Sequence, residues 1–333
     1  MRPVTLVTGG CGYIGSHVVY ALLDRGHVPV IVDDLSLGNR LLVPIDVPIY
    51  CFDYGNITMM REVLSRFKPA HIIHLAAFSD VAESMEKPNK YYRNNVASLV
   101  DLVDICELHG VRNFIFASSA AVYGGRLTGE RFTEDSLLQP CNTYGYTKVF
   151  GENILASARN INSVSLHFFN VAGADAQLRC GEINASNHII KRAALAAIGR
   201  VPSFKLYGTD YPTQDGTCIR DYIHVSDIAS AHLAAIDKLE ATGGKHVYNL
   251  GLGKGFSNYE VIAEMKSVSG VDFSVNAHSR RDGDPPVLIA DNSKALSELN
   301  WFPHVNTLHR ICKSALDWEY NVWRGAPAPT FRG

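Results

Sequence analysis

The first half of the chain alternates short apolar runs with longer segments of helical periodicity. The apolar runs predict strands over residues 3–7, 28–32, 71–75, 113–117 and 163–169. The periodic segments predict helices over residues 13–25, 57–67, 89–109 and 144–160. Near-continuous apolar strands that alternate with helices are typical of a parallel sheet covered on both faces. We therefore predict an α/β fold, for which a doubly wound strand order is the usual outcome.

The second half of the chain is less regular. Helical periodicity covers residues 188–199, 225–239 and about 307–323. A short strand falls within residues 270–290, while 171–187 and 207–221 have loop-like sequences. The tail over residues 325–333 predicts a frayed end. This change of pattern places a domain boundary near residue 170, and the chain can cross back after it.

Composition and charge exclude several classes of protein. The 333-residue chain is 47% hydrophobic and 19% charged, which suits one large globular domain or two coupled domains. A formal net charge of -2 gives no overall basic field to attract nucleic acid or an anionic membrane. No apolar run reaches the roughly 18 residues of a membrane-spanning helix. Scattered cysteines without a Cys-x-x-Cys pair predict reduced thiols, a cytoplasmic protein and no metal site.

A glycine-rich turn follows the first predicted strand. Gly9, Gly12 and Gly15 are three residues apart, and the run from Gly10 also satisfies G-x-G-x-x-G. Such a turn between a strand and a helix lets the backbone approach a pyrophosphate, although alone the motif is weak. Asp33 ends the next strand, where an acid binds the adenosine ribose hydroxyls and repels a 2′-phosphate. The sequence therefore predicts NAD rather than NADP.

Two further positions are candidates for cofactor contacts. Asp53 follows a short apolar run and can meet the adenine amino group, although a turn or cap role explains it nearly as well. Ala76 belongs to a small, apolar strand end where backbone should line the cofactor. Core packing alone would also explain that strand end.

The run from Asn142 to Lys148 carries the most informative chemistry. Tyr144 and Lys148 are one helical turn apart, on the same helix face. A tyrosine that takes a proton near neutral pH needs its pKa lowered by about 3 units from about 10, roughly 4 kcal/mol in favour of the phenolate. The ammonium of Lys148 and a positive nicotinamide can supply this. Ser119 ends the preceding strand and can hydrogen-bond the reacting oxygen, whereas an isolated Tyr-x-x-x-Lys would be a chance surface pair.

Seven stretches carry a further pattern. They are residues 8–17, 81–84, 91–96, 118–124, 169–174, 215–227 and 280–284. Together they resemble the extended short-chain dehydrogenase/reductases and, within them, the UDP-glucose (UDP-galactose) 4-epimerases, over nearly the whole chain. The runs Arg-Asp-Tyr-Ile-His-Val and Arg-Arg-x-Gly-Asp are specific to this group of sugar-nucleotide enzymes.

The resemblance implies a set of roles. Ser119, Tyr144 and Lys148 match the catalytic residues. With the positions above, the predicted cofactor-binding residues are Gly9, Gly12, Tyr13, Ile14, Gly15, Asp33, Asp53, Ala76, Asn94, Tyr144 and Lys148. The predicted substrate-binding residues are Ser119, Tyr144, Asn170, Arg220, Arg281, Asp284 and Leu288.

Individual substrate roles also come from the resemblance. Asn170 matches a contact to a substrate phosphate, and Asn94 lies near the cofactor pyrophosphate. Arg220 and Arg281 match the arginines that clamp the UDP pyrophosphate, a geometry suited to guanidinium groups. Asp284 matches the uridine ribose contact.

The implied reaction is the interconversion of UDP-glucose and UDP-galactose through NAD-dependent oxidation at sugar C4. Related 4,6-dehydratases carry an acid pair after the active-site serine or threonine, where this chain has Ala120 and Ala121. Without that acid, loss of the 6-hydroxyl lacks its proton donor. A non-catalytic NAD-sensing regulator is an alternative from another class, but such a protein would usually have lost Tyr144 or Lys148.

The identity of the sugar stays open. N-acetylhexosamines, uronates and pentoses are alternatives on the same catalytic centre. Leu288 matches the gate beside the sugar; it is smaller than tyrosine and larger than the cysteine or serine that admits an N-acetyl group. The chain also departs from the family at Thr143, His167, Phe168 and Lys191, which stand where proline, arginine, tyrosine and proline are usual.

The resemblance further implies a domain division and an oligomer. Residues 1–170 are expected to form an NAD-binding Rossmann domain, with a smaller UDP-sugar-binding α/β domain mainly from 171–333. The chain is expected to cross back near 218–250. The helices over 89–109 and 144–160 match the pair that forms a four-helix dimer interface, so a homodimer is predicted.

Overall fold

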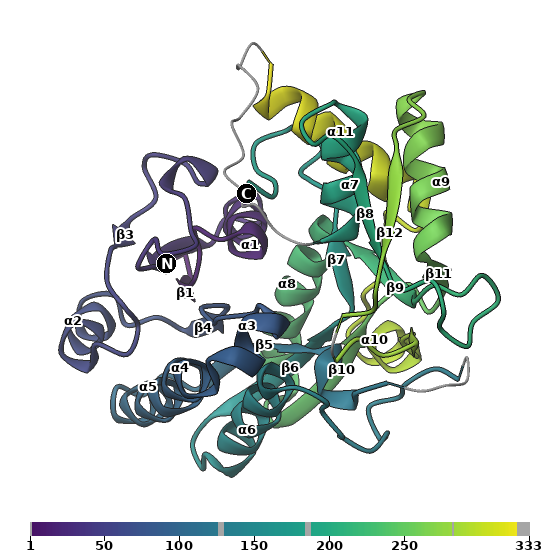
Figure 1. Ribbon diagram of the computed structural model, residues 1–333. Helices are drawn as coiled ribbons and strands as arrows, with labels where there is room; N and C mark the ends of the chain where they lie inside the picture. The colour runs from purple at the N-terminus through teal and green to yellow at the C-terminus, as the bar shows by residue number, and fades with distance from the viewer. Residues whose placement is uncertain (1, 126–129, 184–187, 282, 325–333) are drawn as a thin grey trace.

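A computed structural model describes residues 2–125, 130–183, 188–281 and 283–324, so the prediction for the tail over 325–333 lies outside the described residues. A seven-stranded sheet forms the centre of the larger lobe (Figure 1). Its strands are β1 (Val4–Thr8), β2 (Val28–Val32), β3 (Ile49–Tyr50), β4 (His71–His74), β5 (Asn113–Ser119), β6 (Asn162–Phe168) and β10 (Lys245–Leu250). The strand order is β10-β6-β5-β4-β1-β2-β3, and every neighbouring pair is parallel.

Helices cover both faces of this sheet (Figure 1). One face carries α1 (Tyr13–Asp24) and α8 (Val225–Thr242), which pack against each other. The other face carries α2 (Ile57–Phe67), α3 (Val81–Glu86), α4 (Pro88–Tyr92), the π-helical turn η2 (Arg93–Ala97), α5 (Ser98–Leu108) and α6 (Thr143–Ser157). Along β1, the buried Leu6 packs into the core beneath α2 and α5, and the buried Val7 packs into the core beneath α1 and α8. Both faces of the strands are therefore apolar, as the continuous runs predicted.

The second lobe is built from shorter elements. Its main sheet centres on β9 (Ile219–His224), which pairs with β7 (Asn170–Ala172), β11 (Gly255–Ser257) and β13 (Val287–Leu288); only β11 is antiparallel. A separate parallel pair joins β8 (Phe204–Tyr207) to β12 (Val275–His278). Three helices pack together beside them, α7 (Ile189–Ala197), α9 (Asn258–Ser269) and α11 (Leu308–Val322). The remaining helical segments are η1 (Arg40–Leu42), η3 (Ala120–Tyr123) and α10 (Ser293–Glu298).

The predicted α/β class with a doubly wound parallel sheet is confirmed. The long helix expected over 89–109 forms as three consecutive helical segments, α4, the π-helical turn η2 and α5, which together cover residues 88–108. The loop expected over 207–221 was wrong at its end, because β9 already begins at Ile219. The polar pair Arg220 and Asp221 hides this strand in the sequence. Asp221 is nevertheless buried, because its carboxylate accepts hydrogen bonds from the backbone of Leu252, Gly253 and Ala290.

The helices of the described chain were also compared with the thickness of a bilayer. Within residues 2–125, 130–183, 188–281 and 283–324, none is long and apolar enough to span a membrane. In the same residues, no group of three or more histidine, cysteine, aspartate or glutamate side chains is arranged to hold a metal ion.

Candidate active site

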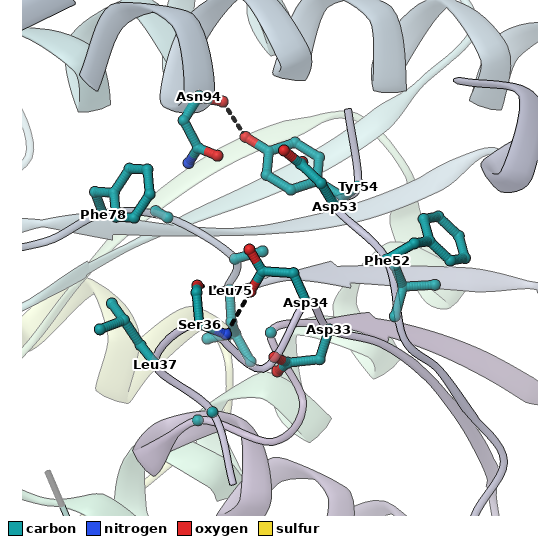
Figure 2. Close-up of a pocket in the computed structure, with 16 residues that line it drawn as sticks. Asp33, Asp34, Ser36, Leu37, Phe52, Asp53, Tyr54, Leu75, Phe78 and Asn94 are labelled. Carbon is teal, nitrogen blue, oxygen red and sulfur yellow. Dashed lines mark hydrogen bonds between the residues drawn. The ribbon is translucent and has the colours of Figure 1, made fainter. Parts of the chain in front are cut away.

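Two hollows open where the strand order reverses, at the carboxyl ends of the central strands. Chain segments leave β1 and β4 in opposite directions across the sheet, which creates a crevice above these neighbouring strands. The first hollow, of about 580 Å³, lies over β1, β2 and β4 and is drawn in Figure 2. The second, a cleft of about 1440 Å³, lies between the two lobes.

The glycine turn shapes the floor of the first hollow. Gly9 has φ +72°, and a Cβ there would lie 2.7 Å from the backbone nitrogen of Ala76. At Gly15 a Cβ would lie 2.1 Å from the carbonyl oxygen of Gly9, so glycine lets α1 pack against the turn. Gly12 lines the hollow and precedes α1, whose first turn has no side-chain cap. The free helix N-terminus beside a glycine backbone fits the pyrophosphate of a dinucleotide.

The acids predicted for the adenosine half lie on this hollow. Asp33 and Asp53 line it from the segments after β2 and β3, and Asn94 lies across from them on η2 (Figure 2). Burial raises the pKa of Asp33, but its carboxylate accepts hydrogen bonds from Leu35 and Cys11 backbone nitrogens at 2.9 Å, which counteract the rise. Asp53 also accepts from the backbone of Gly55 at 2.9 Å, so its cap role and its place on the hollow coexist. These residues fit the adenosine end of NAD.

Most of the predicted substrate residues meet at the second cleft. Its lining includes Tyr13, Ile14, Ser119, Tyr144, Asn170, Arg220, Asp284 and Leu288. They come from both lobes and from segments far apart in the chain. Tyr13 also ties the lobes together, because its hydroxyl donates to the carbonyl of Gly173 at 2.6 Å.

Helix α6 positions Tyr144 and Lys148, the pair that the sequence predicts to be catalytic. The side chain of Asn142 caps the helix by accepting from the backbone of Gly145 at 2.8 Å. Tyr144 faces the cleft from the first turn, while Lys148 is buried beneath it. The Lys148 Nζ donates to the carbonyl of Ala117 at 2.7 Å and lies 5.6 Å from the centre of the Tyr144 ring. The lysine is therefore fixed between α6 and β5, close beneath the tyrosine.

Burial shifts the pKa values of both Tyr144 and Lys148, and for Tyr144 the shift is opposite to the lowering that proton transfer needs. Burial raises the pKa of Tyr144, and a hydrogen bond with Ser119 works in the opposite direction. Burial lowers the pKa of Lys148 to about 8, although the nearby Glu152 raises it. Lowering the pKa of Tyr144 therefore depends on charge that reaches it from Lys148 and from the nicotinamide of bound NAD.

Sequence reasoning missed a buried polar network behind Lys148. Glu152 follows Lys148 by one further helical turn and accepts from Ser118 and, at 2.8 Å, from His167. The spacing of Tyr144, Lys148 and Glu152, four residues apart on one helix face, was a signal that could have found it. The partner His167 could not be paired with it from spacing alone, because it lies on β6.

The two predicted phosphate-binding arginines are not in equivalent positions. Arg220 is buried on the cleft wall, with its Nη2 3.8 Å from Asp284. The guanidinium of Arg281 does not line the cleft and instead stacks 3.9 Å from the ring centre of Tyr207. In the described structure, one arginine faces the cleft and the other stacks at its edge.

The cleft has a second wall that the sequence did not indicate. Lys191 on α7 and Glu319 on α11 line it and form a buried ion pair at 2.5 Å. Lys191 also donates to the carbonyl of Glu182 at 2.6 Å, and Trp323 donates to Glu319 at 3.1 Å. This pair joins two helices of the second lobe at the edge of the cleft.

The fold, the dinucleotide hollow and the Ser-Tyr-Lys arrangement define an NAD-dependent enzyme of the short-chain dehydrogenase/reductase type. The chain belongs to the NAD dependent epimerase/dehydratase family, which it matches over residues 5–251. It is 42% identical over 324 residues to a UDP-glucose 4-epimerase of Azospirillum brasilense, covering 96% of this chain and 93% of that protein.

Solved structures give the same result. A UDP-glucose 4-epimerase from Brucella ovis in complex with NAD superposes with a TM-score of 0.90 at 39% identity, over 95% of this chain and 98% of that one. The UDP-Glc/GlcNAc 4-epimerase from Campylobacter jejuni superposes with a TM-score of 0.82 at 42% identity, over 96% and 99% of the two chains.

Proposed function

We propose that this protein interconverts UDP-glucose and UDP-galactose by epimerisation at C4, with NAD as its resident cofactor. The observation that carries the proposal is the position of Tyr144. Its ring faces the inter-lobe cleft, which Ser119 also lines, and the buried Lys148 lies behind it. The dinucleotide hollow adjoins this point, and the relatives at about 40% identity support the same activity.

The side chains divide the chemistry between them. Tyr144 takes the proton from the 4-hydroxyl and later returns it, while Ser119 hydrogen-bonds the same oxygen. NAD, held in the hollow lined by Gly12, Asp33 and Asn94, would supply the hydride acceptor for C4 of the sugar and the donor for its return to the opposite face. The charge on Lys148 favours the phenolate form of Tyr144, which burial alone disfavours. The proton transfer contributes about 10²- to 10⁴-fold in rate.

Turning of the sugar between the two hydride transfers requires a firm hold on the UDP. Arg220, Asp284 and Asn170 line the cleft, where they hold the UDP moiety. Arg281 stacks on Tyr207 and would have to turn toward the cleft to contact the pyrophosphate. In this assignment residues 1–170 bind NAD and residues 171–333 mainly bind the UDP-sugar. β10 is a strand from the second half that completes the large sheet.

A second candidate is relaxed specificity for an N-acetylated sugar. Leu288 lines the cleft, buried among apolar side chains that include Phe169 and Ala120. A leucine leaves more room than a tyrosine there, and the superposable Campylobacter jejuni enzyme is named for both UDP-Glc and UDP-GlcNAc. Turnover of UDP-glucose with none of UDP-N-acetylglucosamine would eliminate this candidate.

We also propose that the protein is a cytoplasmic homodimer. Apolar side chains are exposed on the adjacent helical segments α4, α5 and α6: Tyr92, Val100, Leu108, Tyr146 and Phe150. Pairing of this surface with that of a second copy would form a four-helix interface and cover them. The seven cysteines are all free, which suits a reducing compartment. Light scattering after gel filtration at micromolar concentration should give twice the chain mass of 36.6 kDa; a monomer would contradict the dimer.

The first experiment is incubation of the purified protein with UDP-galactose and no added cofactor, followed by proton NMR of the sugar signals. A mixture of UDP-glucose and UDP-galactose is the expected result, and it would also establish that NAD is retained. No conversion, even after NAD is added, would reject this substrate. UDP-N-acetylhexosamines and UDP-uronates would then be tested on the same centre.

A further inference from the structure

His167 is a buried titratable side chain that the proposed mechanism does not use. Its side chain is 1% exposed, on the strand next to the one that ends at Ser119. The register of β5 and β6 places Ser118 opposite His167. Both side chains reach the same carboxylate oxygen of Glu152, from one side of the sheet.

The carboxylate of Glu152 interacts electrostatically with the imidazole of His167 and with the ammonium of Lys148. Its Oε1 is 2.8 Å from Nε2 of His167, and Glu152 follows Lys148 by one turn of α6. Lys148, Glu152 and His167 are all largely shielded from water, so their charges interact strongly. A charge gained or lost at His167 therefore changes how much of the Glu152 charge is felt at Lys148.

The other ring nitrogen of His167 faces acceptors. Nδ1 is 2.8 Å from the hydroxyl of Tyr123 and 3.2 Å from Oδ1 of Asn249. The Asn249 amide is oriented by its own Nδ2, which donates to the carbonyl of Phe132 at 2.8 Å. Tyr123 donates its proton to the same Oδ1 at 2.8 Å. The doubly protonated imidazolium thus has an acceptor at each nitrogen.

We propose that His167 is a positioning residue that acts through Glu152 to set how firmly Lys148 holds its proton beneath Tyr144. The inference rests on the proposed catalytic role of Lys148. The titratable groups that face His167 are Glu152 from α6, Tyr123 from η3, and Glu134, whose carboxylate accepts from the backbone of Asn249 at 2.7 Å.

The electrostatic balance agrees with this geometry. Burial acts to lower the pKa of His167, but Glu152, together with Asn249 and Glu134, outweighs it and the pKa is raised. Burial acts to raise the pKa of Glu152, but His167, together with Ser118 and Lys148, outweighs it and the pKa is lowered. A charged His167 offsets the negative charge of Glu152, so the carboxylate stabilises the ammonium of Lys148 less. When His167 is neutral, the full carboxylate charge stabilises that ammonium.

Two substitutions separate charge from packing. His167→Gln is always neutral, and His167→Arg is always charged. His309→Gln is the matched control, because His309 pairs with Glu264 at the same 2.8 Å but on the exposed faces of α11 and α9. Circular dichroism would show whether each variant is folded, and the comparison with the wild type rests on folded His167→Gln.

The decisive readout is the titration of Lys148 by NMR in NAD-loaded protein labelled with ¹³C at the lysine ε-carbons, with Lys148→Arg for assignment. We expect the pKa of Lys148 to rise by roughly one unit in His167→Gln and to stay level or fall in His167→Arg. His309→Gln should not move it. Equal Lys148 titration in the wild type and in folded His167→Gln, or a higher Lys148 pKa in folded His167→Arg, would overturn the proposal.

Turnover of UDP-galactose against pH gives the functional readout. The alkaline limb of kcat should move to higher pH in His167→Gln and not in His167→Arg. A shift of the Lys148 titration without any turnover would reject the proposed substrate and keep the inference about His167. Turnover in every variant with coincident alkaline limbs would reject the inference and keep the proposed function.

Discussion

The first hollow and the inter-lobe cleft are built in opposite ways. The hollow is lined by residues between Gly9 and Asn94, all from the larger lobe, above a closely packed glycine turn. The cleft is lined by residues between Tyr13 and Glu319, mostly side chains from both lobes. A site built within one lobe suits a cofactor that stays bound, and a site shared by two lobes suits a substrate that enters, turns and leaves. Changes at each should therefore affect different measurements.

Tyr144→Phe is expected to separate turnover from NAD binding most strongly. The variant keeps the ring but loses the proton-transfer group, so kcat should fall by about 10²- to 10⁴-fold. NAD binding, followed by calorimetry on cofactor-stripped protein, should stay within a few-fold because the hollow is untouched. Ser119→Ala is the companion variant, with a smaller loss expected. A Tyr144→Phe enzyme within tenfold of wild-type turnover would contradict the assigned role.

The buried Lys191–Glu319 pair tests the cleft wall. Lys191→Met leaves Glu319 uncompensated between α7 and α11, which should lower the free energy of unfolding by about 3–5 kcal/mol. The double variant Lys191→Met with Glu319→Leu should recover most of this stability, because two apolar side chains replace the pair. Urea unfolding measures both. If the double variant is as unstable as the single one, an uncompensated charge on Glu319 is not the cause of the instability.

Glycine substitutions test the hollow. Gly15→Ala places a Cβ against the Gly9 carbonyl, so the turn must shift and stability should fall by about 1–3 kcal/mol. Gly12→Ala meets only one atom, at 3.3 Å, and should cost less stability while weakening NAD binding at the helix N-terminus. Urea unfolding and NAD calorimetry on the two proteins give the comparison. Equal losses of stability would show that the close contact at Gly15 is not what requires glycine.

The smallest effect, counted per unit of pH, is expected for the stability of the folded protein in acid. Burial lowers the pKa values of four histidines, to about 4 for His17 and His232 and about 3 for His74 and His224. The unfolded chain takes up these protons near pH 6.5, well before the folded chain does. Folded stability should therefore fall as pH drops below 6.5, by up to about 1.4 kcal/mol per unit for each histidine.

Urea unfolding at several pH values measures this slope. His232→Phe keeps a ring in contact with Phe168 and removes one titrating group, so its slope should be shallower than that of the wild type. An unchanged slope would assign the acid sensitivity to other groups.

The sequence predicted the hollow better than the cleft for a physical reason. The glycine turn, the helix behind it and Asp33 are local features, and local patterns determine local geometry. The predicted catalytic pair could also be found in the sequence, because Tyr144 and Lys148 share one helix face. The contact between Glu152 and His167 depends on the register of two strands, and Lys191 meets Glu319 across much of the second half of the chain. Such long-range pairs leave no periodic trace.

Short strands explain what was missed in the second lobe. β11 and β13 have three and two residues, too few to show a period. The position of Arg281 could not be read from the chain either, because its stacking on Tyr207 follows from the pairing of β8 with β12.

The place of β10 at one end of the large sheet has a consequence for synthesis. β6 leaves the ribosome roughly 80 residues before β10, the strand that pairs with it. At roughly 5–20 residues per second, the edge of β6 waits roughly 4 to 16 s for its neighbour. During that time the nascent protein carries an unpaired, apolar strand edge of the kind that recruits other chains. Chaperone dependence and yield in the cell should therefore be governed by the interval between these two strands.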